Sequence, residues 1–131
     1  MKNCKLLVLL LSVCIACHAT LQSGNAHFIV KNLKTEYAVT PLGLDVELPR
    51  FSWQMESLGA ERGLQQTAYQ IIVSDEKGNI VWDSGKTQNR FSLNVVYNGT
   101  SLQPSTRYSW TVTVWNQRGE QMSKLLGLKQ D

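Results

Sequence analysis

Short runs in which apolar and polar residues alternate dominate the chain from residue 33 onward. Residues 51–55 (FSWQM) alternate strictly, and residues 108–114 (YSWTVTV) form the most regular run. Residues 69–73 and 91–97 follow the same pattern with one irregular position each. Because successive side chains of a strand point to opposite faces, each run predicts a strand with one buried and one polar face.

Turn-forming residues separate these runs. Gly, Asn or Pro occurs in residues 41–43, 76–79, 84–86 and 98–100, and these residue types favour tight turns. No segment shows a convincing helical period. Several short strands with frequent turns predict an all-β domain, either an antiparallel sandwich or a small barrel.

The segment before the most regular run favours the sandwich. Residues 102–108 (LQPSTRY) resemble the tyrosine corner of fibronectin type III domains, in which a Tyr at the start of a strand bonds its hydroxyl to upstream backbone. Tyr108 is the structural tyrosine of this interpretation, and Trp53 is a core residue of an early strand. The alternative is an ordinary loop that leads into a strand beginning with Tyr.

The N-terminal residues resemble an export signal. Lys2 and Lys5 precede an apolar run, residues 6–16, which is shorter than the roughly 20 residues that a membrane-spanning helix needs. We therefore predict a signal peptide over residues 1–19 and an exported protein, located in the periplasm, outside the cell or on the outer membrane of a bacterium.

The whole chain of 131 residues, 43% hydrophobic and with a net charge of +3, has room for one domain. Removing the signal peptide takes away two of the three surplus charges, and no basic cluster remains. We therefore expect no nucleic-acid partner.

The three cysteines, Cys4, Cys14 and Cys17, all lie in the N-terminal segment. Cleavage before Cys17 would make the protein a lipoprotein with a lipid on that cysteine. Cleavage after Ala19 would release it without an anchor, and the pattern favours neither site. We expect no internal disulfide, and membrane contact only through such a lipid.

Candidate chemistry is sparse in the exported part. The acidic pairs Asp45 with Glu47, Glu56 with Glu61, and Asp75 with Glu76 lie in or beside predicted turns, where solvated acids are the default. His27 is the only secure histidine, so no zinc site or catalytic triad can be assembled. We expect no catalytic residue, metal site or cofactor.

Two tryptophans are candidates for a functional surface. Trp115 shares parity with Thr111 and Thr113, the polar face of its strand, whereas the parity of Trp82 is ambiguous. For Trp115 we weigh packing against a neighbouring domain first, filling of the core at a strand end second, and stacking on a sugar third.

Five segments in a fixed order carry a family resemblance: residues 40–45 (TPLGLD), 49–53 (PRFSW), 66–73 (QTAYQIIV), 81–86 (VWDSGK) and 108–115 (YSWTVTVW). Together they resemble the N-terminal module of bacterial α-L-rhamnosidases of glycoside hydrolase family 78, over residues 33–119. The resemblance implies a fibronectin-III-like or immunoglobulin-like sandwich ahead of further β-domains and a helical barrel with the catalytic acids. No such barrel is present in this sequence.

The C-terminus departs from the family pattern. Residues 120–131 have no aromatic residue and no Ser-rich stretch with Trp, and a truncation or frameshift near Ser123 is the simplest account. We therefore expect the last strand to be missing or degenerate, with residues 125–128 as a poor substitute and an unpaired edge at the strand ending at Trp115.

These observations predict four segments: a signal peptide (1–19), a linker (20–32), the sandwich (33–119) and a divergent tail (120–131). The resemblance implies a non-catalytic accessory module of a secreted α-L-rhamnosidase-like enzyme, with that enzyme's catalytic and β-domains as partners. The alternative is an autonomous carbohydrate-binding module for rhamnose-containing glycans.

Overall fold

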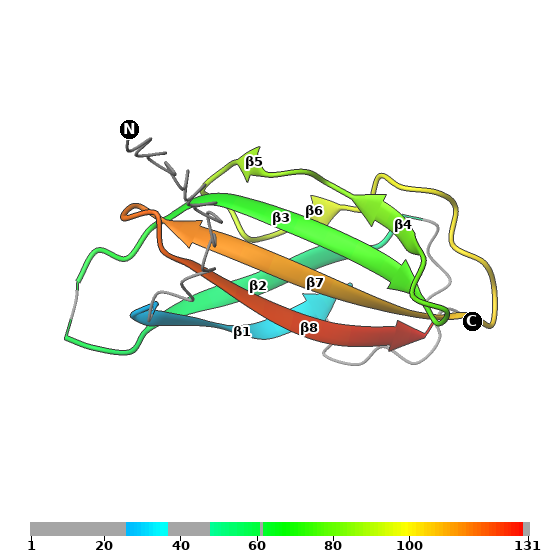
Figure 1. Ribbon diagram of the computed structural model, residues 1–131, viewed down its shortest axis with the longest axis horizontal. Coiled ribbons are helices and arrows are strands. Elements are labelled where there is room, and N and C mark those ends of the chain that lie inside the picture. The colour runs from blue at the N-terminus through cyan, green and yellow to red at the C-terminus, as the bar shows by residue number, and fades with distance from the viewer. Residues whose placement is uncertain (1–25, 37–47, 61, 130–131) are drawn as a thin grey trace, which may run out of the picture.

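The computed structural model describes residues 26–36, 48–60 and 62–129, which form two antiparallel β-sheets (Figure 1). The predicted signal peptide and Cys17 lie outside the described residues. In chain order the strands are β1 (Phe28–Thr35), β2 (Arg50–Ser57), β3 (Gln66–Asp75), β4 (Ile80–Asp83), β5 (Thr87–Gln88), β6 (Val95–Val96), β7 (Arg107–Asn116) and β8 (Gln121–Lys129). Within the described ranges, no helix is long and apolar enough to span a membrane.

The smaller sheet has the order β1-β2-β6, and the larger one has the order β4-β3-β7-β8 with β5 also paired to β3. The longest ladder joins β3 to β7, from Gln66 opposite Asn116 to Asp75 opposite Tyr108. In the smaller sheet β1 pairs with β2 across a register shift between Lys31 and Lys34. The prediction of an all-β antiparallel sandwich is confirmed.

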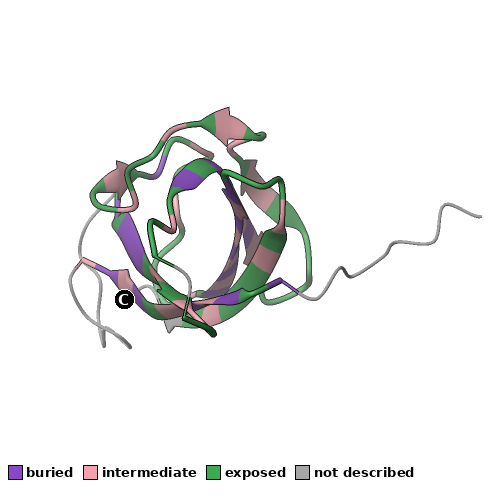
Figure 2. Cartoon of the chain, turned by 90° about the vertical axis from the view of Figure 1, so that its left-hand side faces the viewer, coloured by how far each residue is buried: buried purple, intermediate pink, exposed green. Residues whose placement is uncertain are grey.

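The core lies between the two sheets, and buried residues alternate with more exposed ones along the strands (Figure 2). Trp53 and Phe51 of the smaller sheet and Trp110 of the larger sheet are almost completely buried. The rings of Phe51 and Trp110 have centroids 4.6 Å apart, so they join the sheets directly. The indole N–H of Trp53 donates a 2.8 Å hydrogen bond to Oε1 of the buried Gln66.

The connection from the smaller to the larger sheet ends at Tyr108. The backbone N–H of Gln103 donates a 2.7 Å hydrogen bond to the Tyr108 hydroxyl, five residues further along the chain. This is the bond between a Tyr hydroxyl and upstream backbone that the resemblance to a tyrosine corner implies. It ties the loop to the start of β7.

The last strand was expected to be missing or degenerate, and the first of these alternatives is wrong because β8 is present. β8 pairs with β7 from Gln121 opposite Trp115 to Lys129 opposite Arg107. The ladder is made of backbone hydrogen bonds, which do not depend on aromatic side chains, and Met122 and Leu126 still pack against the core. Since β7 has a neighbour on both sides, its end at Trp115 is not an unpaired edge.

Two other expectations need correction. β1 begins at Phe28, so the sandwich begins inside the segment that was predicted to be a linker (20–32). Of the run 91–97, only Val95–Val96 forms a strand, while Phe91 and Leu93 are 61% and 65% exposed. Asn94 has a φ of 56°, a left-handed conformation that interrupts the extended backbone of this run.

Candidate functional site

Trp115 lies near the end of β7 on the outer face of the larger sheet. Its neighbours in the ladder are Ala68 of β3 and Gln121 of β8, whereas Val114 beside it points into the core. The indole is half-buried, and the ammonium Nζ of Lys86 lies 4.5 Å from the ring centroid. A sugar that stacked on this face of the ring would have to displace that ammonium group.

Polar side chains lie on the same sheet face near Trp115. Nε2 of Gln70 donates a 2.9 Å hydrogen bond to Oδ1 of Asp83, and the hydroxyls of Thr113 and Ser123 are 2.7 Å apart across β7 and β8. The hydrogen bond from Gln70, together with one from the Gly85 N–H, lowers the pKa of the Asp83 carboxyl. These four groups already bind one another, so a ligand would have to replace these contacts to use them.

The segment Asp83, Ser84 and Gly85, part of the family resemblance over residues 81–86, forms the turn after β4. The Asp83 carboxylate accepts the Gly85 N–H at 2.8 Å, and Oγ of Ser84 accepts the Ile71 N–H at 2.8 Å. Gly85 has a φ of 65°, which favours glycine. Each of these residues therefore has a structural role in the turn.

Trp82 belongs to the margin of the core. It lies opposite Val73, a buried residue, and its ring stacks on Phe51 at 6.1 Å and meets Tyr97 edge-on at 5.2 Å. Gly99 packs so closely that a Cβ placed there would be 2.5 Å from the Trp82 Cβ. With both rings against it, the half-buried Trp82 has little free surface for a ligand.

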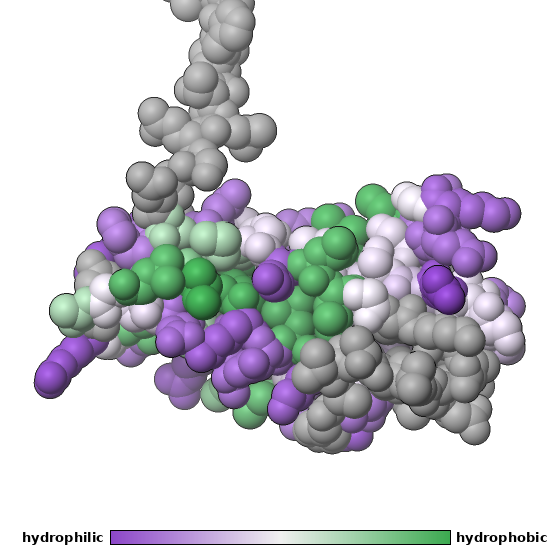
Figure 3. All heavy atoms as spheres, turned by 90° about the horizontal axis from the view of Figure 1, so that it is seen from below, coloured by the Kyte–Doolittle hydropathy of each residue, from purple (hydrophilic) through white to green (hydrophobic). Residues whose placement is uncertain are grey.

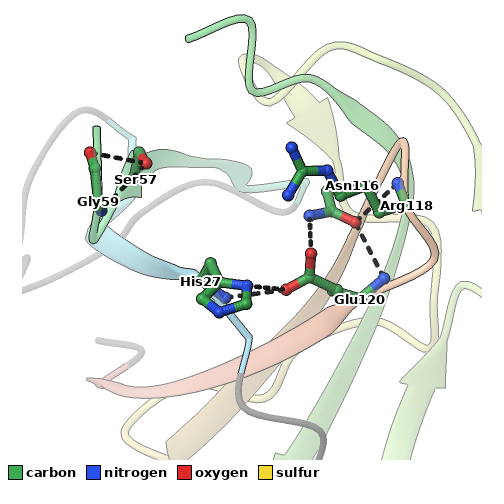
Figure 4. A network of polar contacts seen from close by, with 6 residues as sticks. All are labelled: His27, Ser57, Gly59, Asn116, Arg118 and Glu120. Carbon is green, nitrogen blue, oxygen red and sulfur yellow. Dashed lines mark hydrogen bonds and ion pairs between the residues drawn. The ribbon is translucent and has the colours of Figure 1, made fainter. Parts of the chain in front are cut away.

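A polar network joins the β7–β8 turn to the residue before β1 (Figure 4). Oε2 of Glu120 accepts the backbone N–H of His27 at 2.9 Å, and Nδ1 of His27 lies 3.4 Å from the same oxygen. Oδ1 of Asn116 accepts the N–H groups of Arg118 and Glu120 at 3.0 and 2.9 Å. The hydrogen bond from the His27 backbone is the main reason why the pKa of Glu120 is lowered.

Hydrogen bonds also lower the pKa of two other carboxyl groups, those of Asp75 and Glu36. Hydrogen bonds from Asn79 and Lys77 lower the pKa of Asp75, which holds the β3–β4 turn. The Arg50 guanidinium lowers the pKa of Glu36, with 3.0 Å between Arg50 Nη2 and Glu36 Oε2. A general acid for glycoside hydrolysis needs a raised carboxyl pKa, and the shifts at these residues have the opposite direction.

A pocket of about 330 Å³ lies between the end of β2 and the start of β3, lined by Met55, Leu64, Gln65, Gln66, Arg90 and Ser92. The Gln66 amide in its wall is fully used, because its Nε2 donates to the backbone oxygens of Asn89 and Phe91 at 3.0 and 2.9 Å. The Arg90 guanidinium lies 5.1 Å from the Phe91 ring centroid. The pocket therefore has no evident set of convergent groups for a ligand.

Of the acidic pairs considered from the sequence, Asp45, Glu47 and Glu61 lie outside the described residues. Within the described ranges, no three His, Cys, Asp or Glu side chains gather closely enough to hold a metal ion. The residues that sequence reasoning missed are Lys86, which lies over the Trp115 ring, and the hydrogen-bonded pair Gln70 and Asp83 on the same sheet face. No local pattern marks them, since β3, β4 and β7 bring them together only in the folded sheet.

Comparisons with known proteins give one consistent result. The family described as "Rha78A-like, N-terminal immunoglobulin domain" matches residues 30–125. A curated α-L-rhamnosidase of Streptomyces avermitilis is 44% identical over 94 residues, which cover 69% of this chain but 9% of that protein. The chain thus spans about a tenth of the length of this relative.

Solved structures agree with this match. The S. avermitilis α-L-rhamnosidase structure, a complex with L-rhamnose, superposes with a TM-score of 0.71 at 37% identity, over 79% of this chain and 10% of that one. The α-L-rhamnosidase from Dictyoglumus thermophilum gives a TM-score of 0.70 at 32% identity, over 78% of this chain and 12% of that one. In both structures the similarity covers one small part of a much longer chain.

Proposed function

The chain belongs to the family of Rha78A-like N-terminal immunoglobulin domains, and from that premise we propose that it is a non-catalytic accessory domain of a secreted α-L-rhamnosidase-like glycoside hydrolase. The proposal rests on how small a part of the relative's length this chain matches. The match takes in 69% of this chain and 9% of the curated S. avermitilis rhamnosidase. The hydrolytic residues of such an enzyme then belong to the remaining nine tenths of its length.

The chemistry of the described residues supports an accessory role. Asp75 and Asp83 hold turns, Glu36 pairs with Arg50, and Glu120 binds the His27 backbone, so these carboxylates are committed to structural contacts. A retaining or inverting glycosidase needs two carboxyl groups facing a sugar, one of them protonated near neutral pH. The lowered pKa values of these four carboxyl groups suit charged structural groups instead.

An autonomous carbohydrate-binding module is the second candidate. The observation in its favour is the half-buried Trp115, with Lys86, Gln70 and Asp83 on or beside the same face. The position of Lys86 over the indole argues against it. Calorimetric titration of the chain with L-rhamnose and rhamnose-containing oligosaccharides decides the matter, since a carbohydrate-binding module would show saturable heat that is lost in Trp115→Ala.

Two measurements test the accessory role. The chain without residues 1–19 is expected to show no hydrolysis of an aryl α-L-rhamnoside, and detectable hydrolysis would refute the proposal. The S. avermitilis rhamnosidase is then prepared in two forms, one lacking its matching segment and one with that segment replaced by residues 26–129 of this chain. We expect deletion to lower the unfolding temperature of the enzyme and the replacement to restore it at least in part.

We also propose that residues 1–19 direct export. Expression of the full chain in a bacterium, followed by mass spectrometry of the exported protein, distinguishes the two cleavage sites. A mature N-terminus at Cys17 with an added lipid mass indicates a lipoprotein, whereas an N-terminus at Thr20 indicates simple secretion. A product that stays in the cytoplasm with its N-terminal segment intact would refute export.

A further inference from the structure

The outer face of β3, β7 and β8 in the larger sheet carries no charge over three neighbouring rows. The outward residues of β3, β7 and β8 lie opposite one another in rows that the ladders define. These rows are Gln70, Thr113 and Ser123, then Ile72, Thr111 and Leu125, then Ser74, Ser109 and Gly127, with Trp115 and Gln121 at one end. None of these residues is charged.

Charged residues lie around this face. Asp83 is opposite Ile72 on the neighbouring β4, Lys86 lies over Trp115, and Arg107 begins β7. At the centre Leu125 is 62% exposed although it is a large aliphatic residue. An uncharged centre with a polar rim, containing an exposed Leu and a Trp, is the composition of a protein interface.

Apolar side chains also occur along the edge of β8, where the exposed Lys124 interrupts them. On the side where β1 and β8 lie, apolar side chains gather over the left and middle of the view, with polar side chains among and around them (Figure 3). Met122 and Leu126 of β8, both partly buried, pack against the core beside this edge. The contact surface therefore consists of the outer face of β3, β7 and β8 together with the adjoining edge of β8.

We infer that this surface binds the part of the same polypeptide that follows the domain in a rhamnosidase-like enzyme, an inference that rests on the proposed function. The size of the surface supports this occupant. With strands about 4.8 Å apart and about 3.4 Å per residue, the face between Ser109 and Trp115 measures roughly 15 by 20 Å, or about 300 Å². A stable complex between separate proteins buries about 800 Å² per partner, whereas interfaces between domains of one chain begin near 300 Å² per side.

Covalent connection compensates for the small area. A tethered partner is held at a high effective concentration, so a contact too weak for separate molecules is occupied in one chain. In the relatives this domain is N-terminal, so the rest of their chain follows its last strand. That strand is β8, which lies in the same sheet and carries Leu125, so the chain that follows starts beside the proposed surface.

The experiment uses the replacement enzyme described above, in which residues 26–129 stand in the S. avermitilis rhamnosidase. Leu125→Glu and Thr111→Glu each place a charge at the centre of the surface. Val96→Glu is the matched control, because Val96 is 48% exposed and lies opposite Arg50 on the outer face of the smaller sheet. Each variant is also made in the 131-residue chain alone, to measure its effect on the domain itself.

We expect Leu125→Glu and Thr111→Glu to lower the unfolding temperature of the domain in the replacement enzyme by at least 3 °C more than in the chain alone. Val96→Glu should cause the same change in both. Equal effects of the three variants, or no difference between enzyme and chain, would overturn the proposed surface while leaving the accessory function intact. A replacement enzyme no more stable than the deletion enzyme would instead overturn the accessory function, and this surface with it.

The chain alone also tests a second copy as the occupant. We expect it to sediment as a monomer at 100 μM. A dimer that Leu125→Glu dissociates and Val96→Glu does not would overturn the tethered partner in favour of self-association.

Discussion

The outer faces of the two sheets follow the same alternation of inward and outward side chains, yet they differ in charge. On the smaller sheet Lys31 pairs with Glu56, and Arg50 pairs with Glu36. On the larger sheet the central rows consist of hydroxyl, amide and aliphatic side chains. Exposed ion pairs add little to stability, but their desolvation disfavours burial against a partner. The difference therefore concerns what each face contacts rather than how strongly each sheet folds.

The largest expected effect comes from the core that both faces share. Phe51 is fully buried and touches Trp110 across the sandwich, so Phe51→Ala removes a ring that joins the sheets. We expect a loss of about 3–5 kcal/mol in unfolding free energy, measured by urea denaturation followed by tryptophan fluorescence. The exposed Phe91 provides the control, since Phe91→Ala should cost less than about 1 kcal/mol. Similar losses for both variants would contradict the assigned core.

A smaller effect is expected where a loop meets the margin of the core. In Gly99→Ala the new methyl group would lie 2.5 Å from the Trp82 Cβ and 2.6 Å from the Tyr97 hydroxyl. Relief of this overlap requires movement of the rings, so we expect destabilisation by about 1–3 kcal/mol in thermal unfolding. Gly59→Ala is the control, because nothing lies within 4 Å of the Cβ that would be added there. A neutral Gly99→Ala would show that the loop relaxes freely.

The charged face should show a dependence on pH. The pKa of Glu36 is lowered below its ordinary value of 4.5, chiefly by hydrogen bonding to the Arg50 side chain. This pair therefore stabilises the fold fully above pH 4.5, and the contribution disappears as the pH falls through the lowered pKa. Glu36→Gln should cost less than about 1 kcal/mol at pH 7 and flatten the acid part of the stability curve.

That curve is measured by thermal unfolding from pH 7 down to pH 3. Glu76→Gln, at an exposed position of the β3–β4 turn, is the matched control. An unchanged acid slope in Glu36→Gln would show that the ion pair contributes nothing to the acid dependence.

The smallest expected effect concerns the uncharged face. Lys86→Ala removes the ammonium group that lies 4.5 Å from the Trp115 ring centroid, and we expect a loss of about 0.5–1 kcal/mol. The same variant exposes the indole, so a carbohydrate-binding module would bind L-rhamnose more tightly after the change. For an accessory domain we expect no binding in either form, and calorimetry compares the two.

The alternation along the chain was enough to predict an all-β domain and the burial of Trp53, because the period of two is a property of the extended backbone itself. Residues 91–97 show the limit of that argument. Their apolar pattern predicts a strand, yet Asn94 adopts a positive φ and the aromatic and aliphatic side chains at positions 91 and 93 remain exposed. The pattern reports which residues can be buried, and the neighbouring strands decide which are.

The last strand, β8, shows the opposite case, in which a strand forms although the sequence pattern did not predict it. Residues 120–131 lack the aromatic residues of the family pattern, and this suggested a missing strand. β7 nevertheless pairs with β8 along its length through backbone groups that every residue type except proline provides. The composition of residues 120–131 therefore did not predict whether they form a strand, because β7 offers a long row of backbone groups for pairing.

The sequence by itself determined the fold class, the parity of Trp115 and the family resemblance, since these depend on the spacing and order of residues along the chain. Only the tertiary structure decided that Lys86 covers Trp115. The same holds for the packing of Trp82 against Phe51 and Tyr97 at the margin of the core. It also holds for the position of Leu125 among uncharged side chains. Those relations join side chains from different strands and loops. They arise from sheet register, which depends on the whole set of backbone pairings and not on any one segment.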